Sequence, residues 1–480
     1  MTALIVDTAA GKLRGAELDD GILTWRGIPY AAPPTGPLRF RPPRPVESWS
    51  GLRDASEYGA PAMQVWRPMA GFPGARTVPE LPPPDEDCLF LNVTTPAGAE
   101  GRPVLVWLHG GGYHVGSGTD MATDGSSFAR SHGVVVVTLN HRLGALGFLA
   151  VPGESPTGAF GLHDQAAALL WVRDNIAAFG GDPGQVTIYG ISAGAKSVAN
   201  LMVSPLARGL FARAASSSGG AEHVASPAQA AAVTARFLRE LGTDRLREVP
   251  AADLVAAQTA IAQDLRATWL WRPMIDGVAL TTRPLDALAA GTAAGVPLLI
   301  QHCVEECLLY GLMDPHAADD AERVLDDYFG PGGRAEIIDA YRAARPELDD
   351  SGLRFAIMTD ERYAIPTTRM ADAQSPHAPV YRSRYDGPFS IPGMSPLPGA
   401  HGLDGGLIWA GGPGLAGDLH DAWGAFASGG VPAPDWPVYR TDRRATMIFA
   451  EAGSQVVDDP RAEQRRAWEG RDWVSGTWFD

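Results

Sequence analysis

The sequence predicts an α/β protein in which a mostly parallel central sheet is covered by helices on both faces. Short apolar runs rich in β-branched residues alternate along the chain with longer amphipathic stretches, as is typical of parallel strands joined by helices. The apolar runs are continuous, as expected of strands buried on both faces. No internal repeat or low-complexity linker interrupts this pattern, so we expect one domain over residues 1–480.

The apolar runs and the residues around them predict the individual elements. Buried strands are predicted over four segments, Val104–Leu108, Val134–Leu139, Val186–Tyr189 and Val296–Ile300. A helix is predicted over Asp164–Phe179, because this segment carries an apolar stripe and is followed by two glycines. Another is predicted over Pro227–Leu241, with Ser226 as its N-cap. Two further helices are expected over Ala318–Phe329 and Leu353–Ala373.

The composition is that of an ordinary globular chain and argues against several kinds of partner. Hydrophobic residues make up 45% and charged residues 20% of the 480 residues, enough for a large core. The formal charge of −16 argues against nucleic acid, which needs a basic surface. The apolar runs are far too short to cross a membrane, and Met1–Asp7 lacks the features of a signal peptide. We therefore expect a soluble, cytoplasmic monomer or homodimer.

The chain has three cysteines, Cys88, Cys303 and Cys307. Their odd, small number argues against a disulfide framework. The spacing of Cys303 and Cys307 suits one helical face, but no cluster of His or Cys residues accompanies them. Reduced thiols are therefore favoured over a metal site, and we expect neither a metal nor an organic cofactor.

The central chemical motif is Gly190-Ile-Ser-Ala-Gly194, which directly follows the predicted strand Val186–Tyr189 and precedes a stretch that can be helical. A G-x-S-x-G motif between a strand and a helix is typical of a nucleophilic serine, here Ser192, held on a strained turn. The helix N-terminus behind such a serine favours negative charge. An ordinary strand-to-helix turn is the alternative, because so short a motif arises by chance in a chain with 56 glycines.

A second glycine-rich segment, His109-Gly-Gly-Gly-Tyr113, follows the predicted strand Val104–Leu108. Consecutive glycines leave backbone N–H groups open to close approach by a ligand. In serine esterases such a loop supplies oxyanion donors together with the residue after the nucleophile. Here those donors are Gly111, Gly112 and Ala193, which would stabilise a tetrahedral oxyanion. A flexible glycine loop is the alternative, but the two motifs in this order favour the catalytic interpretation.

Several longer segments match motifs of one known family. Phe179–Gly194 matches a nucleophile signature, and Glu86–Val93 matches a second signature. Further matches are Trp25–Pro34, Arg39-Phe40, Asp276-Gly277 and Trp436–Tyr439, with Trp25 where Phe is usual. From about Val6 to Tyr439, the chain thus resembles the type-B carboxylesterase family, which includes bacterial para-nitrobenzyl esterases and the cholinesterases. The resemblance implies an α/β-hydrolase fold with helical insertions over the active site, and hydrolysis of small-molecule esters.

The resemblance also implies a serine–glutamate–histidine triad in that chain order. The stretch Leu299–Cys307 matches the family's acid segment, which places Glu306 as the acid and leaves Glu305 as the alternative. Gly399–Asp404 matches the family's base segment, one residue shorter, with His401 as the base. Ser192 would attack the ester carbonyl and His401 would transfer the proton. Glu306 would hold the imidazole tautomer and stabilise the imidazolium.

The sequence departs from the family pattern beside the nucleophile and in the acid segment. Ile191 stands where the family usually has Glu, which leads to the hypothesis that the site suits neutral rather than cationic esters. Packing beneath the turn is the alternative role for Ile191. Gln301-His302-Cys303 stands where Gly-Thr-Asn is expected, and Cys307 replaces Gly. This altered acid loop suggests a specialised substrate or altered catalysis.

Candidate residues of the substrate pocket can be chosen only by their position next to the motifs in the sequence. We predict that Tyr113, which abuts the oxyanion glycines, and Ile191 bind substrate. Other aromatic residues near the motif loops are more often core than substrate contacts; they are Trp269, Trp271, Phe389 and Trp409.

Two other functions use the same fold. One is a biosynthetic acyltransferase, or a lactone-forming or lactone-opening enzyme, with the same triad. The other is a non-catalytic, cholinesterase-like binding module, since a fold alone does not fix function. The presence of Ser192, Glu306 and His401 favours an enzyme over the binding module.

Overall fold

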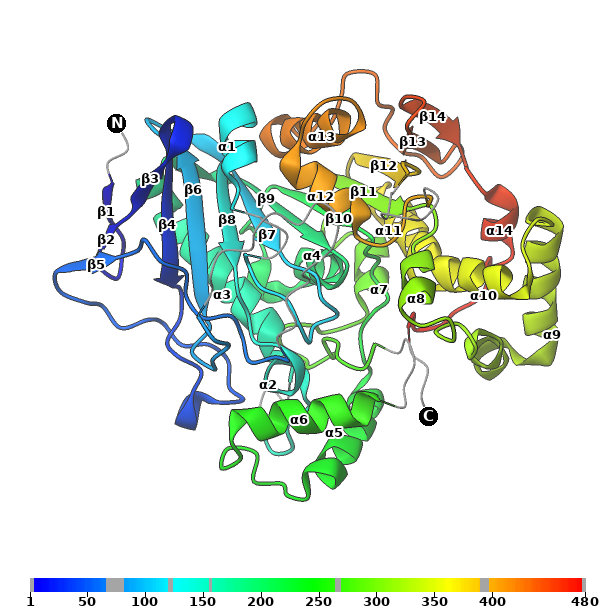
Figure 1. The fold of residues 1–480 in the computed structure, drawn as a ribbon, viewed down its shortest axis with the longest axis horizontal. Coiled ribbons are helices and arrows are strands. Elements are labelled where there is room, and N and C mark those ends of the chain that lie inside the picture. Colours follow the sequence, from blue (N-terminus) through cyan, green and yellow to red (C-terminus); the bar gives the residue numbers. More distant parts are fainter. Residues whose placement is uncertain are drawn as a thin grey trace.

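The computed structural model describes residues 4–65, 82–119, 124–154, 158–263, 269–388 and 397–476. Over these residues, eleven strands form one large sheet in the order β14-β13-β12-β11-β10-β9-β7-β8-β6-β4-β3 (Figure 1). Its strands are β3 Ala16–Leu18, β4 Ile22–Pro29, β6 Phe90–Pro96, β7 Arg102–Leu108, β8 Val135–Leu139, β9 Gly181–Ile191, β10 Arg213–Ser217, β11 Leu298–Cys303, β12 Val380–Tyr385, β13 Ala445–Phe449 and β14 Gln455–Asp458. The central strands from β8 to β13 pair in parallel, and the outer strands pair antiparallel, so the predicted mostly parallel sheet is confirmed.

A small sheet near the start of the described chain has the order β1-β2-β5. Its strands are β1 Ile5–Asp7, β2 Lys12–Arg14 and β5 Leu52–Asp54. The helices are α1 Ser126–His132, α2 Gly144–Phe148, α3 Phe160–Asn175, α4 Ala193–Val203, α5 Pro227–Leu241, α6 Ala251–Ala262, α7 Pro284–Ala289, α8 Leu308–Met313, α9 Ala321–Ala344, α10 Asp350–Thr359, α11 Ile365–Gln374, α12 Leu403–Ala410, α13 Leu415–Gly429 and α14 Ala462–Arg466.

Helices cover both faces of the large sheet, because side chains alternate between the faces along each strand. In β7, Val104 and Val106 belong to a buried cluster with residues of α3, α4, α7 and α11. Leu105 and Trp107 belong to a second cluster, with residues of α1, α12 and α13. Away from these layers, α5 packs with α6 and α9 packs with α10, each pair at the periphery of the sheet in Figure 1.

The predicted strands and helices are confirmed, with shifted ends. The helix Pro227–Leu241 begins with a capping box between Ser226 and Gln229. The helix expected over Asp164–Phe179 begins earlier, as α3, and continues as a 3₁₀ turn before Gly180 ends it at a φ of 85°.

The two later helix predictions differ more from the structure. The helix expected over Ala318–Phe329 extends as α9 to Ala344 across a break at Gly330, whose φ is 68°. The segment Leu353–Ala373 is split by a π-helical turn, Asp360–Ala364, between α10 and α11. Such turns recur at functional sites, and this one contributes to the site described below. Within the described ranges, no helix combines the length and apolarity needed to cross a membrane.

Candidate active site

Ser192 lies at the sharp turn between β9 and α4. Its backbone has φ 56° and ψ −120°, a strained combination for a residue with a side chain. The motif positions have no room for a side chain, because a Cβ at Gly190 would lie 2.3 Å from the backbone of Gly194. A Cβ at Gly194 would lie 1.9 Å from the carbonyl oxygen of Leu108. The turn therefore holds Ser192 at the N-terminus of α4, where the helix dipole favours negative charge.

Ser192, His401 and Glu306 form one hydrogen-bonded chain. His401 Nε2 lies 2.8 Å from Ser192 Oγ, and His401 Nδ1 lies 2.6 Å from Glu306 Oε2. The Glu306 side chain is fully buried, whereas the His401 side chain is 12% exposed. With the Nδ1 proton donated to the carboxylate, Nε2 is left to accept the proton of the serine hydroxyl. The structure thus brings together three residues that lie in separate segments of the sequence.

Two donors hold the other oxygen of the Glu306 carboxylate. Ser218 Oγ donates to Oε1 at 2.6 Å, and the Cys303 backbone N–H donates to the same oxygen at 2.7 Å. The His401 backbone N–H also donates to the Glu306 carbonyl oxygen at 3.1 Å. The altered acid loop therefore still presents a carboxylate to His401, in a fixed orientation.

Glu305, the alternative acid, is bound elsewhere. Its carboxylate pairs with Arg345 at 3.0 Å and also with Arg461. Arg461 donates a further hydrogen bond to the Val304 carbonyl oxygen at 2.9 Å. Of the two neighbouring glutamates, only Glu306 contacts His401.

The glycine loop lies against the serine turn, since a Cβ at Gly110 would lie 3.4 Å from Ser192 Cβ. Gly111 and Gly112 have φ values of 104° and 61°, and a Cβ at Gly111 would collide with a carbonyl oxygen at 2.1 Å. Neither amide of these two glycines donates a hydrogen bond to another described residue. Ala193 opens α4, where N–H groups have no acceptor inside the helix. Three N–H groups are thus available to a ligand beside Ser192.

Tyr113 and Ile191, the two residues predicted to bind substrate, lie in buried clusters. Tyr113 is 1% exposed, packs on Phe148 with ring centroids 4.7 Å apart, and accepts a hydrogen bond from Ser197 Oγ at 3.3 Å. Ile191 is 3% exposed and lies in the same buried cluster as Trp107. Neighbouring elements enclose both side chains. Ile191 packs beneath the turn, so an apolar side chain stands directly beside Ser192.

A second buried carboxylate lies beneath the hydrogen-bonded chain. Asp404 is fully buried, and its Oδ2 accepts hydrogen bonds from Ser217 Oγ at 2.8 Å and Gln301 Nε2 at 2.6 Å. Ser383 Oγ donates to Gln301 Oε1 at 2.9 Å. Burial, together with the nearby charge of Glu306, raises the pKa of Asp404. Gln301, a departure from the family pattern, is therefore built into the support of the site.

Two tyrosines that the sequence analysis did not single out pack on the His401 ring. The ring centroids of Tyr363 and Tyr310 lie 4.6 Å and 5.7 Å from that of His401. Their hydroxyl oxygens lie 2.6 Å apart, and burial raises the pKa of both phenols. Tyr310 comes from α8 and Tyr363 from the π-helical turn, so no sequence motif connects them to His401.

The other aromatic residues near the motif loops lie partly in the core and partly at the site. Trp271 and Trp409 belong to buried clusters, as expected of most aromatic side chains. Trp269 packs against Tyr363, with ring centroids 5.2 Å apart. Phe389 lies outside the described residues. Ser218 was also missed, although its position after a strand end was a usable signal.

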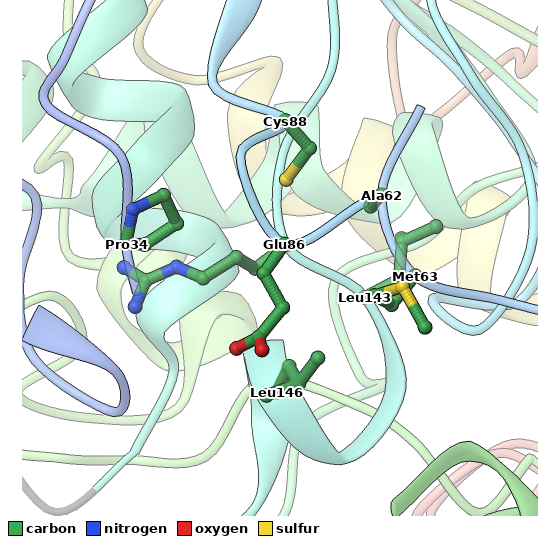
Figure 2. A pocket seen from close by; sticks show the side chains of 8 residues that line it. Pro34, Ala62, Met63, Glu86, Cys88, Leu143 and Leu146 are labelled. Carbon is green, nitrogen blue, oxygen red and sulfur yellow. The ribbon is translucent and has the colours of Figure 1, made fainter. Parts of the chain in front are cut away.

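In the part of the chain that the structure describes, no group of three or more potential ligands could hold a metal ion. The three cysteines are buried free thiols. A separate pocket is lined by Pro34, Ala62, Met63, Glu86, Cys88, Arg142, Leu143 and Leu146 (Figure 2). None of these residues belongs to the Ser192–His401–Glu306 chain. Glu86 pairs with Arg39, and Arg142 with Asp164 at 2.6 Å, so the charged side chains here hold segments together.

Comparison with known proteins places these features in one family. Residues 2–468 match the model of the carboxylesterase family. Para-nitrobenzyl esterase of Bacillus subtilis (strain 168) is 36% identical over 498 residues, covering 97% of this chain and 98% of that protein. Phenmedipham hydrolase of Pseudarthrobacter oxydans is 35% identical, covering 96% and 97%.

Solved structures agree with the sequence matches. A PNB esterase structure superposes with a TM-score of 0.86 at 34% identity, covering 97% of this chain and 100% of that chain. A Geobacillus stearothermophilus carboxylesterase superposes with a TM-score of 0.85 at 35% identity, with the same coverage. The α/β-hydrolase fold expected from the sequence is thereby confirmed.

Proposed function

Because the chain belongs to the carboxylesterase family and is therefore a carboxylic ester hydrolase, we propose that Ser192, His401 and Glu306 are its catalytic triad. The observation that carries the proposal is the 2.8 Å contact between His401 Nε2 and Ser192 Oγ. A base at this distance can accept the hydroxyl proton as the serine attacks. The buried Glu306 carboxylate holds the imidazole in the required tautomer and stabilises its charged form.

The reaction proceeds through an acyl-enzyme. Ser192 Oγ bonds to the ester carbonyl carbon while its proton moves to His401 Nε2, and the carbonyl oxygen becomes an oxyanion. The N–H groups of Gly111, Gly112 and Ala193 donate to that oxyanion, and removal of one such donor typically costs about 3–4 kcal/mol of transition-state stabilisation. His401 then protonates the leaving alcohol, and water attacks the acyl-enzyme by the same steps in reverse order.

The proposed substrates are small-molecule esters, with neutral esters preferred to cationic ones. The apolar Ile191 beside the nucleophile supports this preference, because no carboxylate stands there to attract a cationic group. One relative is named para-nitrobenzyl esterase, for an ester of an aromatic alcohol. Comparing hydrolysis of a quaternary-ammonium ester with its uncharged isostere tests the preference. A higher kcat/KM for the quaternary-ammonium ester would contradict it.

We also propose that residues 1–480 act as one domain. Strands from both ends of the described chain, β3 and β14, belong to the same sheet, which supports a single cooperative unit. A single unfolding transition, followed by both fluorescence and circular dichroism, is the expected result. Two separate transitions would contradict the proposal.

The experiment that tests the triad treats the purified protein with a fluorophosphonate and records its intact mass. One adduct is expected on the wild type and none on Ser192→Ala. Glu306→Gln and Glu305→Gln form a matched pair: the first is expected to slow labelling by about 10³–10⁴-fold, since the tautomer is lost, and the second to leave it unchanged. No adduct on folded wild-type protein would favour the non-catalytic binding module.

A product assay separates hydrolysis from acyl transfer. With a competing alcohol present, the proposed hydrolase releases mainly free acid. Predominant formation of a new ester would favour the acyltransferase alternative.

A further inference from the structure

Lys196 is one of only two lysines in the sequence, and it lies on the helix that follows Ser192. The chain has 39 lysines and arginines, but only two are lysines, Lys12 and Lys196. Lys196 lies in the first turn of α4, and its backbone N–H donates to the Ser192 carbonyl oxygen at 3.0 Å. The second lysine of the chain is therefore one helical turn from the proposed nucleophile.

The Lys196 side chain is buried against aromatic rings. The residue is only 3% exposed. Its Nζ lies 3.7 Å from the ring centroid of Trp269 and 4.8 Å from that of Tyr363. Among the described residues, no side chain forms a hydrogen bond or ion pair with Nζ. Aromatic faces attract a cation, but they do not neutralise it, and a buried charge without a partner is costly.

The acidic groups near Lys196 are occupied by other partners. Glu306 is held by His401 and Ser218. Glu361 lies 3.4 Å from Arg362 and accepts the Gly476 backbone N–H at 2.9 Å. Neither carboxylate forms an ion pair with Lys196 Nζ, and their charges offset that of the ammonium only in part.

Further cationic groups lie in the same region. Arg362 lies 5.0 Å from the ring centroid of Trp269, the same ring that carries Lys196 Nζ. Arg272 donates to the carbonyl oxygens of Ser475 and Gly476, and its positive charge also acts on Lys196. Three cationic side chains, those of Lys196, Arg362 and Arg272, thus lie in one region of a chain whose formal charge is −16.

The aromatic contacts connect Lys196 to the reacting groups. Tyr363 contacts both Lys196 Nζ and the His401 ring, with its ring centroid 4.6 Å from that of the histidine. An anion bound at Nζ would therefore be separated from the His401 ring by a single aromatic side chain.

We propose that Lys196 binds a free carboxylate carried by the ester substrate, so that the preferred substrates are small esters with one carboxylate beyond the scissile bond. The inference rests on the proposed function and narrows its substrate class. Neutral esters remain substrates, and the carboxylate adds an ion pair in a site of low dielectric. A single ammonium suits one carboxylate, in contrast to the forked guanidinium of arginine.

The titration of Lys196 agrees with this geometry. Burial is the main cause that lowers the pKa of its ammonium, to about 7; Glu306 partly opposes the shift, and Arg362 and Arg272 add to it. A carboxylate at Nζ would favour the charged form and raise the pKa.

The first test measures binding without catalysis. Ser192→Ala protein with isotope-labelled lysine has two lysine side-chain signals, and Lys12→Arg identifies the Lys196 signal. The probes are monoethyl glutarate, which carries a carboxylate, and diethyl glutarate, which does not. We expect the monoester to raise the pKa of Lys196 by one unit or more, and the diester to leave it unchanged. Equal shifts with both probes, or none, would overturn the proposal.

The second test measures specificity and locates the carboxylate. One substrate pair is 4-nitrophenyl hydrogen glutarate and 4-nitrophenyl valerate, with the carboxylate on the acyl part. The other is 3-carboxyphenyl butyrate and phenyl butyrate, with the carboxylate on the alcohol part. In Lys196→Met, the ratio of kcat/KM for the anionic to the neutral ester is expected to fall at least tenfold for one pair. The affected pair tells which part of the substrate Lys196 contacts.

Matched variants separate charge from packing. Lys196→Arg retains the charge, so its ratio of kcat/KM for the anionic to the neutral ester is expected to fall less than that of Lys196→Met. Lys12→Met should not change this ratio. If Lys196→Met does not fold, Lys196→Gln replaces it, and the binding test needs no change at position 196. A ratio within twofold of wild type for both pairs would overturn the role of Lys196. If the fluorophosphonate adduct still forms at Ser192 in that case, the proposed function stands.

Discussion

Ser218 and His401 hold opposite oxygens of the same buried carboxylate, that of Glu306. Ser218 Oγ donates to Oε1 at 2.6 Å, and His401 Nδ1 lies 2.6 Å from Oε2. The carboxylate is thereby fixed in its plane, and so is the imidazole that it contacts. The first prediction follows from this arrangement.

Ser218→Ala is expected to lower kcat/KM about tenfold, because loss of a hydrogen bond to a charged group costs about 1.5–3 kcal/mol, part of which the Cys303 N–H retains. The assay is steady-state hydrolysis of a neutral ester. Ser216→Ala is the matched control, since the Ser216 hydroxyl has only a 3.5 Å contact with the Ala195 carbonyl oxygen. Equal losses in both variants would contradict a specific role for Ser218.

Gly111→Ala is expected to lower kcat by about 10²–10³-fold, the usual effect of losing an oxyanion donor. A Cβ at this position would lie 2.1 Å from the Val115 carbonyl oxygen, so the loop must move. Gly98→Ala is the control, because Gly98 also has a positive φ, 73°, but its Cβ would meet nothing within 4 Å. Stopped-flow or steady-state measurement of kcat on the two folded variants, Gly111→Ala and Gly98→Ala, makes the comparison. An unchanged kcat in Gly111→Ala would argue against this loop as the oxyanion site.

Arg142→Met is expected to destabilise the protein by about 3–5 kcal/mol, because removal of one partner leaves a buried charge uncompensated. Asp164 is fully buried, and the Arg142 side chain is 3% exposed. Replacing both, with Arg142→Met and Asp164→Leu, should restore much of the loss. Denaturant unfolding measures the free energies. The exposed pair Arg440 and Asp442 is the control, where Arg440→Met should leave the stability almost unchanged.

Lys196→Met is expected to raise the free energy of unfolding most strongly at low pH. The folded pKa of about 7 lies below that of a free lysine, so the unfolded chain binds more protons between the two values, and the wild type gains stability as pH rises from about 7 towards about 10.4. The advantage of Lys196→Met should therefore be larger at pH 6 than at pH 9. Denaturant unfolding at both pH values measures it. Lys12→Met, at an exposed site, should show no such difference.

The elements of the sheet were predictable because they depend on local patterns. Buried parallel strands such as Val186–Tyr189 are continuous apolar runs, and the helix over Pro227–Leu241 is bounded by its own capping residues. The π-helical turn Asp360–Ala364 was not predictable, because a single inserted residue in a helix leaves no periodic signal. Its consequence, the placement of Tyr363 on His401, was therefore also missed.

The sequence by itself determined the fold class, the serine turn and the residues available for chemistry, since each rests on spacing or on residues adjacent in the chain. Only the tertiary structure decided between Glu306 and Glu305, because these adjacent residues face different segments. Arg345 and Arg461 hold the carboxylate of Glu305. It also placed Tyr113 and Ile191 in the core, where enclosure depends on packing from distant elements. The burial of Lys196 against Trp269 and Tyr363 follows from the same cause, because these rings come from distant segments and no local pattern reports their approach.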